Sequence, residues 1–246
     1  MRRFDSCPAL LLVAVFLLTP ATWAEEVNDS EYQHNWPHWR GPLANGVAPF
    51  ADPPVEWSED KNIKWKVELP GRGTSSPIIW NDKVFVLTAI KTDREGEPPA
   101  TPDTRGPEDH PQFNPFKIEP PSHYHQFVVM CLDRETGEVL WKDLAREAVP
   151  HEGFHDDHGY ASGSPTTDGR YLYASFGSHG VYCYDLEGNR QWEQDLGDMR
   201  TRFSFGEAST PVLHDDTLIV IWDQEEQSKI FAGRKIATNP AIGRPR

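Results

Sequence analysis

The sequence predicts an all-β fold, a β-propeller built from four-stranded antiparallel blades. Within Tyr160–Leu196, four short apolar runs are separated by the turn sequences Asp168-Gly169, Gly177-Ser-His-Gly180 and Asp185-Leu-Glu-Gly188. Asp can hydrogen-bond its own backbone two residues on, and Gly supplies the positive φ that closes such turns. Four strands in about forty residues is the length of one propeller blade.

The blade-sized unit recurs along the chain. The segments Gly73–Thr88, Ala161–Phe176 and Glu207–Trp222 align with one another, each with a proline at the same position. Val129–Leu144 likewise aligns with Val181–Leu196. A unit of this size cannot bury both faces of its sheet alone, so neighbouring units must stack on it. An ordinary antiparallel sandwich with similar hairpins is the alternative.

The beginning of the chain has the features of an export signal. Met1-Arg2-Arg3 is basic, Ala9–Leu18 is apolar, and Ala24 is a small residue suited to cleavage. About ten apolar residues are too few to cross a bilayer as a helix. We therefore expect residues 1–24 to be a signal peptide. The mature protein is expected in the periplasm or outside the cell, without a transmembrane segment.

Residues 25–62 are expected to form an N-terminal extension with a Trp-rich segment, Asn35–Val47. Trp36 and Trp39 would cover apolar surface at the edge of the fold, and Arg40 can stack on one of the rings. Ligand binding by this patch is the alternative to packing.

An isolated outer strand is expected just before the first repeat. In Ile63–Leu69, apolar and charged residues alternate, which predicts a strand with one wet face. Its Trp65 corresponds to Trp141 and Trp192, which we expect to lie in the outer strands of the two full blades, wedged toward the neighbouring sheet. The partial propeller is therefore expected to begin at residue 63 and to end at residue 232.

Lys91–Tyr124 interrupts the first full blade between its second and third strands. The segment is rich in proline and charge and poor in aliphatic residues, so it cannot bury enough surface to order itself fully. We expect this insertion, residues 91–124, to project from one rim of the propeller. Both a binding loop and an insertion without function are consistent with its composition.

A second insertion contains candidate metal ligands. His151, Glu152 and His155 carry imidazole and carboxylate groups, which are ligands for zinc, iron or copper. Their spacing matches no tight template such as HExxH, and no partner residues that would orient them are evident. We expect a solvated loop that binds divalent metal weakly or not at all. No catalytic residue is predicted.

The formal net charge of −14 limits the partners of the chain. So acidic a protein repels phosphate backbones and anionic membrane surfaces, which excludes nucleic acid as a main partner. The acidity also serves to keep an exported protein soluble.

The turn between the third and fourth strands carries a family resemblance. Cys131–Trp141, CLDRETGEVLW, resembles the repeat of pyrroloquinoline-quinone-like (PQQ-like) β-propellers, which reads roughly A-L-D-x-x-T-G-x-x-x-W, and Asp185–Trp192 is a shorter copy. The early WPHWRGP and His151–Pro165 are similar to an exported bacterial subgroup. The resemblance covers Trp36–Ala232. It implies the fold but not an activity, because this fold hosts enzymes, scaffolds and sensors.

Two functions are compatible with this resemblance. The first, which we favour, is a non-catalytic binding or scaffold module for a protein or cell-envelope partner, similar to the outer-membrane assembly lipoprotein and without a cofactor. The second is a quinoprotein dehydrogenase, or a remnant of one, that oxidises an alcohol or sugar with PQQ and calcium. Such enzymes stack the quinone on a disulfide of adjacent cysteines, whereas Cys131 and Cys183 are far apart in sequence. The family's Asp base and calcium ligands match no position in this chain.

Cys131 and Cys183 are expected to be unbridged. They occupy the same position in successive blades, where the family repeat has alanine, so each is interpreted as a small buried filler. Equivalent strands of adjacent blades are also farther apart than the ~6 Å Cα separation of a disulfide. Export to an oxidising compartment argues for the opposite.

The predicted propeller is incomplete, an open arc of about three blades. Six blades of about 45 residues would need more residues than the whole chain of 246, even before the signal peptide is subtracted. The third blade stops in its third strand near Ala232, and residues 233–246 are basic and lack the Asp and Trp of the repeat. We expect an irregular basic tail, a disrupted or truncated reading frame, and an exposed apolar sheet edge.

Overall fold

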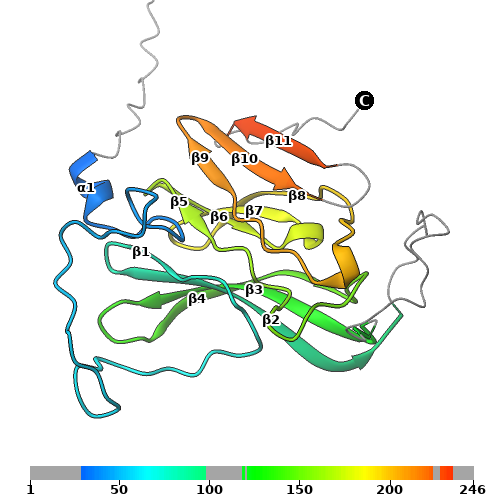
Figure 1. Cartoon of the computed structure of the whole chain (residues 1–246), viewed down its shortest axis with the longest axis horizontal. Helices are drawn as coiled ribbons and strands as arrows, with labels where there is room; N and C mark the ends of the chain where they lie inside the picture. The colour runs from blue at the N-terminus through cyan, green and yellow to red at the C-terminus, as the bar shows by residue number, and fades with distance from the viewer. Residues whose placement is uncertain (1–28, 98–117, 120, 224–227, 235–246) are drawn as a thin grey trace, which may run out of the picture.

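Three antiparallel sheets contain all the described strands of the computed structural model, which describes residues 29–97, 118–119, 121–223 and 228–234 (Figure 1). The first sheet contains β1 (Ile78–Trp80), β2 (Lys83–Glu95), β3 (His123–Asp133) and β4 (Val139–Ala148). The second contains β5 (Thr166–Thr167), β6 (Tyr171–Ser175), β7 (Val181–Asp185) and β8 (Arg190–Gln194). The third contains β9 (Val212–His214), β10 (Thr217–Trp222) and β11 (Lys229–Arg234).

Strands adjacent in sequence are adjacent in each sheet, so every sheet is a meander. The one α-helix of the described part, α1 (Asp29–Gln33), precedes the first sheet, and no described helix is long and apolar enough to cross a membrane. No sheet of the described residues closes on itself. The predicted all-β fold, with two four-stranded blades and a third of three strands in an open arc, is confirmed.

The turn between β5 and β6 shows how the predicted turn chemistry works. The Asp168 carboxylate accepts hydrogen bonds from the backbone N–H groups of Arg170 (3.0 Å) and Tyr171 (2.7 Å). Gly169 has a φ of +85°, which a residue with a side chain rarely adopts. These turn residues therefore fix the register of the hairpin that they close, in which Thr166 pairs with Tyr173.

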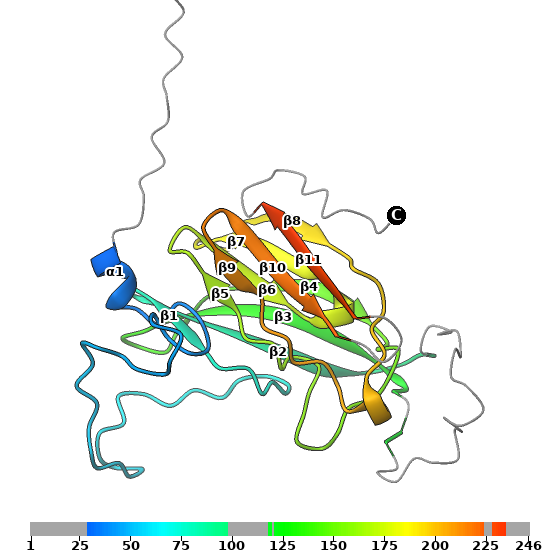
Figure 2. The same cartoon turned by 45° about the horizontal axis from the view of Figure 1, so that its top comes forward.

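The sheets stack face to face and bury a separate core at each contact (Figure 2). Between the first and second sheets, the core includes Phe85, Leu87, Phe127, Leu172 and Tyr184. Between the second and third sheets, it includes Tyr173, Val181, Trp192, Leu218 and Val220. Successive residues of one strand thus serve opposite cores, since side chains alternate across a strand.

A tryptophan and a glycine join the first and second sheets. The Trp141 indole of β4 donates a hydrogen bond of 3.0 Å to the Leu186 carbonyl in the β7–β8 turn of the next sheet. Gly188 in that turn lies so close that a Cβ there would be 2.6 Å from the ring. The predicted wedging of the repeat tryptophan toward its neighbour is confirmed.

Ile63–Leu69, predicted to be an outer strand, is not part of any sheet. It is an extended segment with exposed side chains, since the alternation of apolar and charged residues does not by itself supply a partner for the backbone. Trp65 nevertheless docks as predicted on the first sheet. Its indole donates to the Arg134 carbonyl (2.9 Å), and a Cβ on Gly137 would lie 2.7 Å from the ring.

The N-terminal extension ties the inner strands of the first two sheets together. Trp36 exchanges two backbone hydrogen bonds with Ile79 of β1, of 3.0 and 2.9 Å. The next carbonyl, that of Pro37, accepts from the backbone N–H of Thr167 in β5 (2.9 Å). The extension thus acts as a backbone bridge across the inner ends of two units.

The Trp-rich segment packs as expected only in part. The Trp36 ring covers Gly41, which has a φ of +71° and no room for a side chain. Trp39 is exposed, and the Arg40 guanidinium lies over its ring at 5.4 Å, so the predicted stacking of Arg40 is confirmed.

Two predicted boundaries move. Residues 91–95 and 123–124 belong to β2 and β3, so the Pro-rich insertion is shorter than 91–124, because the hairpin continues into its polar flanks. β11 reaches Arg234, two residues beyond the predicted end of the repeat, since Gly233 and Arg234 still pair with β10. The predicted signal peptide, most of the insertion and residues 235–246 lie outside the described residues.

The two cysteines are free and buried, as predicted. Cys131 lies opposite Trp141 in its sheet, and Cys183 lies opposite Trp192. Burial raises the pKa of the Cys131 thiol to about 12 and that of Cys183 further, so both thiols stay protonated and unreactive.

Candidate functional site

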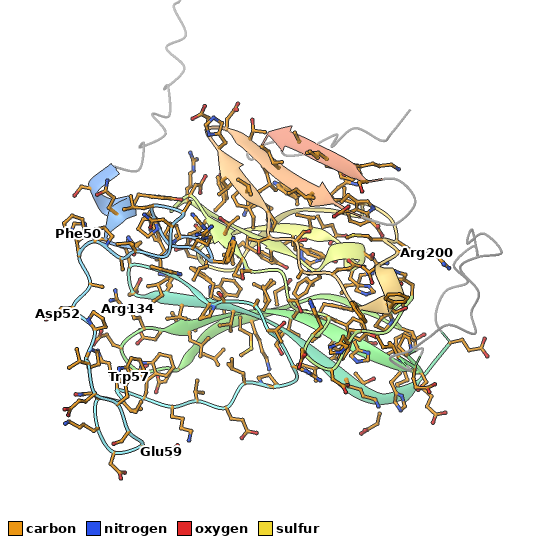
Figure 3. The ribbon with its side chains drawn as sticks, viewed as in Figure 1. Phe50, Asp52, Trp57, Glu59, Arg134 and Arg200 are labelled. Atoms are coloured by element: carbon orange, nitrogen blue, oxygen red, sulfur yellow. The ribbon has the colours of Figure 1, made fainter. Side chains whose placement is uncertain are left out.

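Three connections meet at one rim of the second sheet. They are the loop between β4 and β5, the loop between β8 and β9, and the short 3-10 turn Gly177–His179 between β6 and β7. Arg200, in the second of these loops, marks this side of the molecule in Figure 3. Polar side chains from all three connections converge here.

Glu207 is anchored by the 3-10 turn. One carboxylate oxygen accepts from the Ser178 backbone N–H (2.6 Å), and the other accepts from the Ser178 hydroxyl (2.5 Å). The same hydroxyl oxygen accepts from the Met199 N–H (2.7 Å). Burial raises the pKa of Glu207 to about 7, although the hydrogen bonds from Ser178 and the nearby His151 favour the carboxylate form.

Glu152 is held by the other loop. Its Oε1 accepts from both the backbone N–H (3.0 Å) and the hydroxyl (2.6 Å) of Thr201. Burial raises the pKa of Glu152, and the two bonds from Thr201 oppose that shift. The second carboxylate oxygen takes no part in these two bonds.

His151 is also enclosed at this rim, with a side chain only 3% exposed. Its Nε2 lies 2.6 Å from the Met199 carbonyl oxygen, which can only accept, so Nε2 carries the proton. In the neutral ring Nδ1 then has a lone pair, and this buried nitrogen has no hydrogen-bond partner among the described residues. Nε2 is also 3.9 Å from Glu207 Oε1.

His151, Glu152 and Glu207 form one group, called the rim cluster below. Each offers a nitrogen or oxygen ligand atom, and these atoms lie within 4.8 Å of one another. They line a cavity of about 20 Å³ together with Tyr160 and His179. A cavity of that size has room for a single water molecule or ion.

Part of the cavity wall is aromatic and consists of Tyr160, Phe176 and His179. The His179 ring stacks on Phe127 at 4.1 Å between centroids. Burial lowers the pKa of His179 to about 3, with smaller contributions from His151 and Arg146, so the ring is uncharged at neutral pH. The low polarity of this wall strengthens any electrostatic interaction inside the cavity.

The structure brings together two of the three predicted ligand candidates, His151 and Glu152. His155 lies apart: its ring contacts the Phe205 ring edge-on at 5.2 Å, and its Nδ1 is 3.5 Å from an Asp157 oxygen. The rim cluster does not include it.

Sequence reasoning missed Glu207, although the repeat contains a signal for it. In the two earlier copies the aligned residues are Gly73 and Ala161, both small, and Ala161 is fully buried. A carboxylate at a position that otherwise takes the smallest side chains departs from the packing rule of the repeat. That departure marks Glu207 as a residue with a role other than filling space.

Comparison with known proteins identifies the repeat. Residues 125–245 match a family model described as "Outer membrane protein assembly factor BamB". This match, over just under half of the chain, agrees with the resemblance of the repeat to PQQ-like β-propellers. The search of curated proteins finds no match.

Among solved structures, the chain is similar to BamB from Moraxella catarrhalis, with 13% sequence identity and a TM-score of 0.31. The alignment covers 48% of this chain and 35% of that one, so this chain spans about a third of the length of that protein.

The rim does not fit the quinone cofactor of PQQ-dependent enzymes. The cavity at the rim cluster holds about 20 Å³ and its neighbour, which includes Ser209 and Trp222, about 10 Å³. A tricyclic quinone needs several hundred cubic ångströms, the usual range for a small-molecule pocket. Cys131 and Cys183 lie in different sheets, so neither offers the adjacent-cysteine disulfide on which such a quinone stacks.

Proposed function

We propose that this chain is an exported PQQ-like β-propeller repeat protein that acts as a non-catalytic binding or scaffold module for a protein of the cell envelope. The observation that carries this proposal is an exposed apolar surface on the third sheet. We call it the outward face, and it consists of Val212, Ile221 and Ile230, which are 49, 44 and 71% exposed.

These three residues share one side of the sheet. Ile221 and Ile230 are directly paired across β10 and β11, so their side chains point the same way. Leu218 and Val220 alternate with them along β10 and are buried against the second sheet. The outward face is therefore the side of the third sheet that points away from the second.

The repeat shows that this face is built to be covered. In the aligned copies, Leu87 of β2 occupies the position of Ile221, and Ile78 of β1 occupies that of Val212. Leu87 is 3% exposed and Ile78 is fully buried, because the second sheet covers both. Contiguous exposed aliphatic residues on a sheet that normally receives a neighbour favour a protein partner.

The backbone of β11 offers a second means of attachment. Within the described part of the chain, β11 pairs with β10 alone. An edge strand presents N–H and C=O groups that can pair with an incoming strand. The family description names an outer membrane protein assembly factor, which supports a protein-binding role in the envelope over a catalytic one.

Site-specific photo-cross-linking in an exporting bacterial host tests the proposal. A photoreactive residue at Ile230 or Ile221 should give a discrete cross-linked protein, while one at Val55, an exposed apolar residue far from the third sheet in sequence, should not. No product from either position, or the same product from Val55, would count against a partner at this face. Alcohol oxidation by the purified protein with added PQQ and calcium would support the quinoprotein alternative instead.

A further inference from the structure

We propose that the rim cluster binds one divalent transition-metal ion, held by His151, Glu152 and Glu207 between the loops that follow β4 and β8. This site shares no residue with the outward face, so metal binding here does not depend on the proposed protein-binding function.

The donor set favours a transition metal over calcium or magnesium. One imidazole and two carboxylates suit zinc, manganese or iron, whereas calcium and magnesium prefer oxygen ligands alone. Ligands bound at about 2.0–2.2 Å from one ion lie no more than about 4.4 Å apart. One candidate ligand atom from each residue of the rim cluster lies within 4.8 Å of the others, close to this limit.

The unpartnered nitrogen of His151 is an independent indication of a ligand. A polar atom buried without a hydrogen bond is uncommon, and its desolvation is costly. The Met199 carbonyl fixes the proton on Nε2, the nitrogen 3.9 Å from Glu207 Oε1, which leaves Nδ1 as the nitrogen able to bind a cation. Nδ1 lies 4.0 Å from an Asp198 carboxylate oxygen, which is a further oxygen donor beside it. A metal-bound histidine commonly donates its other ring N–H to a backbone carbonyl in this way.

The two carboxylates are oriented as metal ligands usually are. Thr201 donates two hydrogen bonds to one oxygen of Glu152, and Ser178 donates one to each oxygen of Glu207. Such partners hold ligating groups in place before the ion arrives. The sequence predicted weak or no metal binding because residues that orient the ligands were not evident in it. Thr201 and Ser178 are such residues.

The local charge balance also favours a cation. Glu152 and Glu207 lie close together, and the Glu207 side chain is only 14% exposed. Buried carboxylates are stable in the charged form only when paired with a cation or bound to a metal. A divalent ion satisfies both at once.

Calorimetry on the intact chain tests the proposal directly. The protein is purified without a polyhistidine tag, stripped with a chelator, and titrated separately with zinc and with calcium. We expect one zinc ion per chain with a Kd of about 1 µM or tighter, and calcium at least about tenfold weaker. Absence of stoichiometric zinc binding by the unmodified protein would overturn the proposal without any variant.

Variants then identify the ligands. His151→Ala and Glu207→Gln should each weaken zinc binding about 100-fold or more, and Thr201→Val about 10- to 100-fold. His155→Ala is the matched control from the same loop and should bind zinc like the unmodified protein, because His155 lies outside the cluster. Circular dichroism checks that each variant folds. If a variant of a ligand residue does not fold, the loss of zinc affinity in Thr201→Val tests the site in its place. Equal losses in His155→Ala and His151→Ala would contradict the assignment.

Discussion

The contact between the first and second sheets and the outward face of the third sheet are two versions of the same repeat surface. At the first, Leu87 is buried under the second sheet, while at the second, Ile221 in the aligned position is exposed. Leu87 lies in β2 and Ile221 in β10, and each of these strands has a paired strand on both sides. The side chains alternate in the same way along both strands. The difference is therefore not in the strand but in its neighbour.

This comparison teaches that a propeller blade is specified in two steps. Local sequence fixes the hairpins, their turns and the side of the sheet that each residue faces. Whether an apolar side is buried depends on the next unit, which nothing in the blade itself supplies. An uncovered face thus combines the composition of a core with the exposure of a surface.

The largest expected effect comes from truncating the aligned pair. Leu87→Ala should lower the free energy of unfolding by about 3 kcal/mol, because it opens a cavity between two sheets. Ile221→Ala should lower it by less than about 1 kcal/mol, since that side chain is already in contact with solvent. Urea denaturation of the two variants measures the difference. Equal losses would mean that the outward face is covered within the chain.

The tryptophan joint gives a second matched pair. Gly188 and Gly197 have nearly the same backbone conformation, with φ of +93° and +94°, so alanine strains both alike. A Cβ at Gly188 meets the Trp141 ring, whereas one at Gly197 meets nothing within 4 Å. Gly188→Ala should therefore cost about 1–3 kcal/mol more than Gly197→Ala in urea denaturation. Similar costs would show that the ring moves aside freely.

Acid should weaken the contact between the first and second sheets through His179, whose ring stacks on Phe127. Its pKa is lowered from the ordinary 6.5 to about 3 by burial, so below pH 6.5 the unfolded chain binds a proton that the folded chain does not. Above pH 6.5, His179 is neutral in both states and does not change the free energy of unfolding with pH. As pH falls from 6.5 toward 3, the free energy of unfolding decreases by up to about 1.4 kcal/mol per pH unit.

Replacing this histidine isolates its share of the pH dependence. His179→Phe should flatten the curve of unfolding free energy against pH between about 3 and 6.5, measured by urea denaturation in chelator-treated buffer. His214→Phe, which replaces a histidine of the third sheet whose side chain is 80% exposed, is the matched control. A curve for His179→Phe that parallels the unmodified protein would rule out His179 as the source.

The smallest effect on stability, and a clear one on association, is expected at the outward face. Ile230→Lys should change the free energy of unfolding by less than about 0.5 kcal/mol, since the side chain is exposed. It should reduce self-association at high protein concentration in sedimentation velocity, because a charge on an open sheet discourages edge and face pairing. Val55→Lys is the control, and an equal reduction there would show a general charge effect.

Much of the fold was predictable from particular residues. Asp168 and Gly169 closed a hairpin whose position depends only on local turn chemistry, and the aligned prolines gave the period of the units. Ile63–Leu69 was predicted wrongly as a strand, because alternation reports which side of a segment is wet and not whether its backbone finds a partner.

The rim cluster was predictable only in part. His151 and Glu152 are neighbours in the sequence, and their side-chain chemistry marked them at once. Glu207 reaches them because the repeat places the entry to each inner strand at the same rim. Without the spatial order of the units, a carboxylate so distant in sequence cannot be assigned to the same cavity. The sequence also does not indicate that the hydroxyls of Thr201 and Ser178 bind these carboxylates.

The joint between Trp141 and Gly188 also bears on how such chains evolve. The first sheet carries Trp141 for the following sheet and the turn glycine Gly137 for Trp65 of the preceding segment. A tandem duplication of one unit therefore copies both halves of the joint and creates a matching contact without any new mutation. Arrays of this kind can change their number of units by recombination, and selection can then act on the loops of individual copies, as at Glu207.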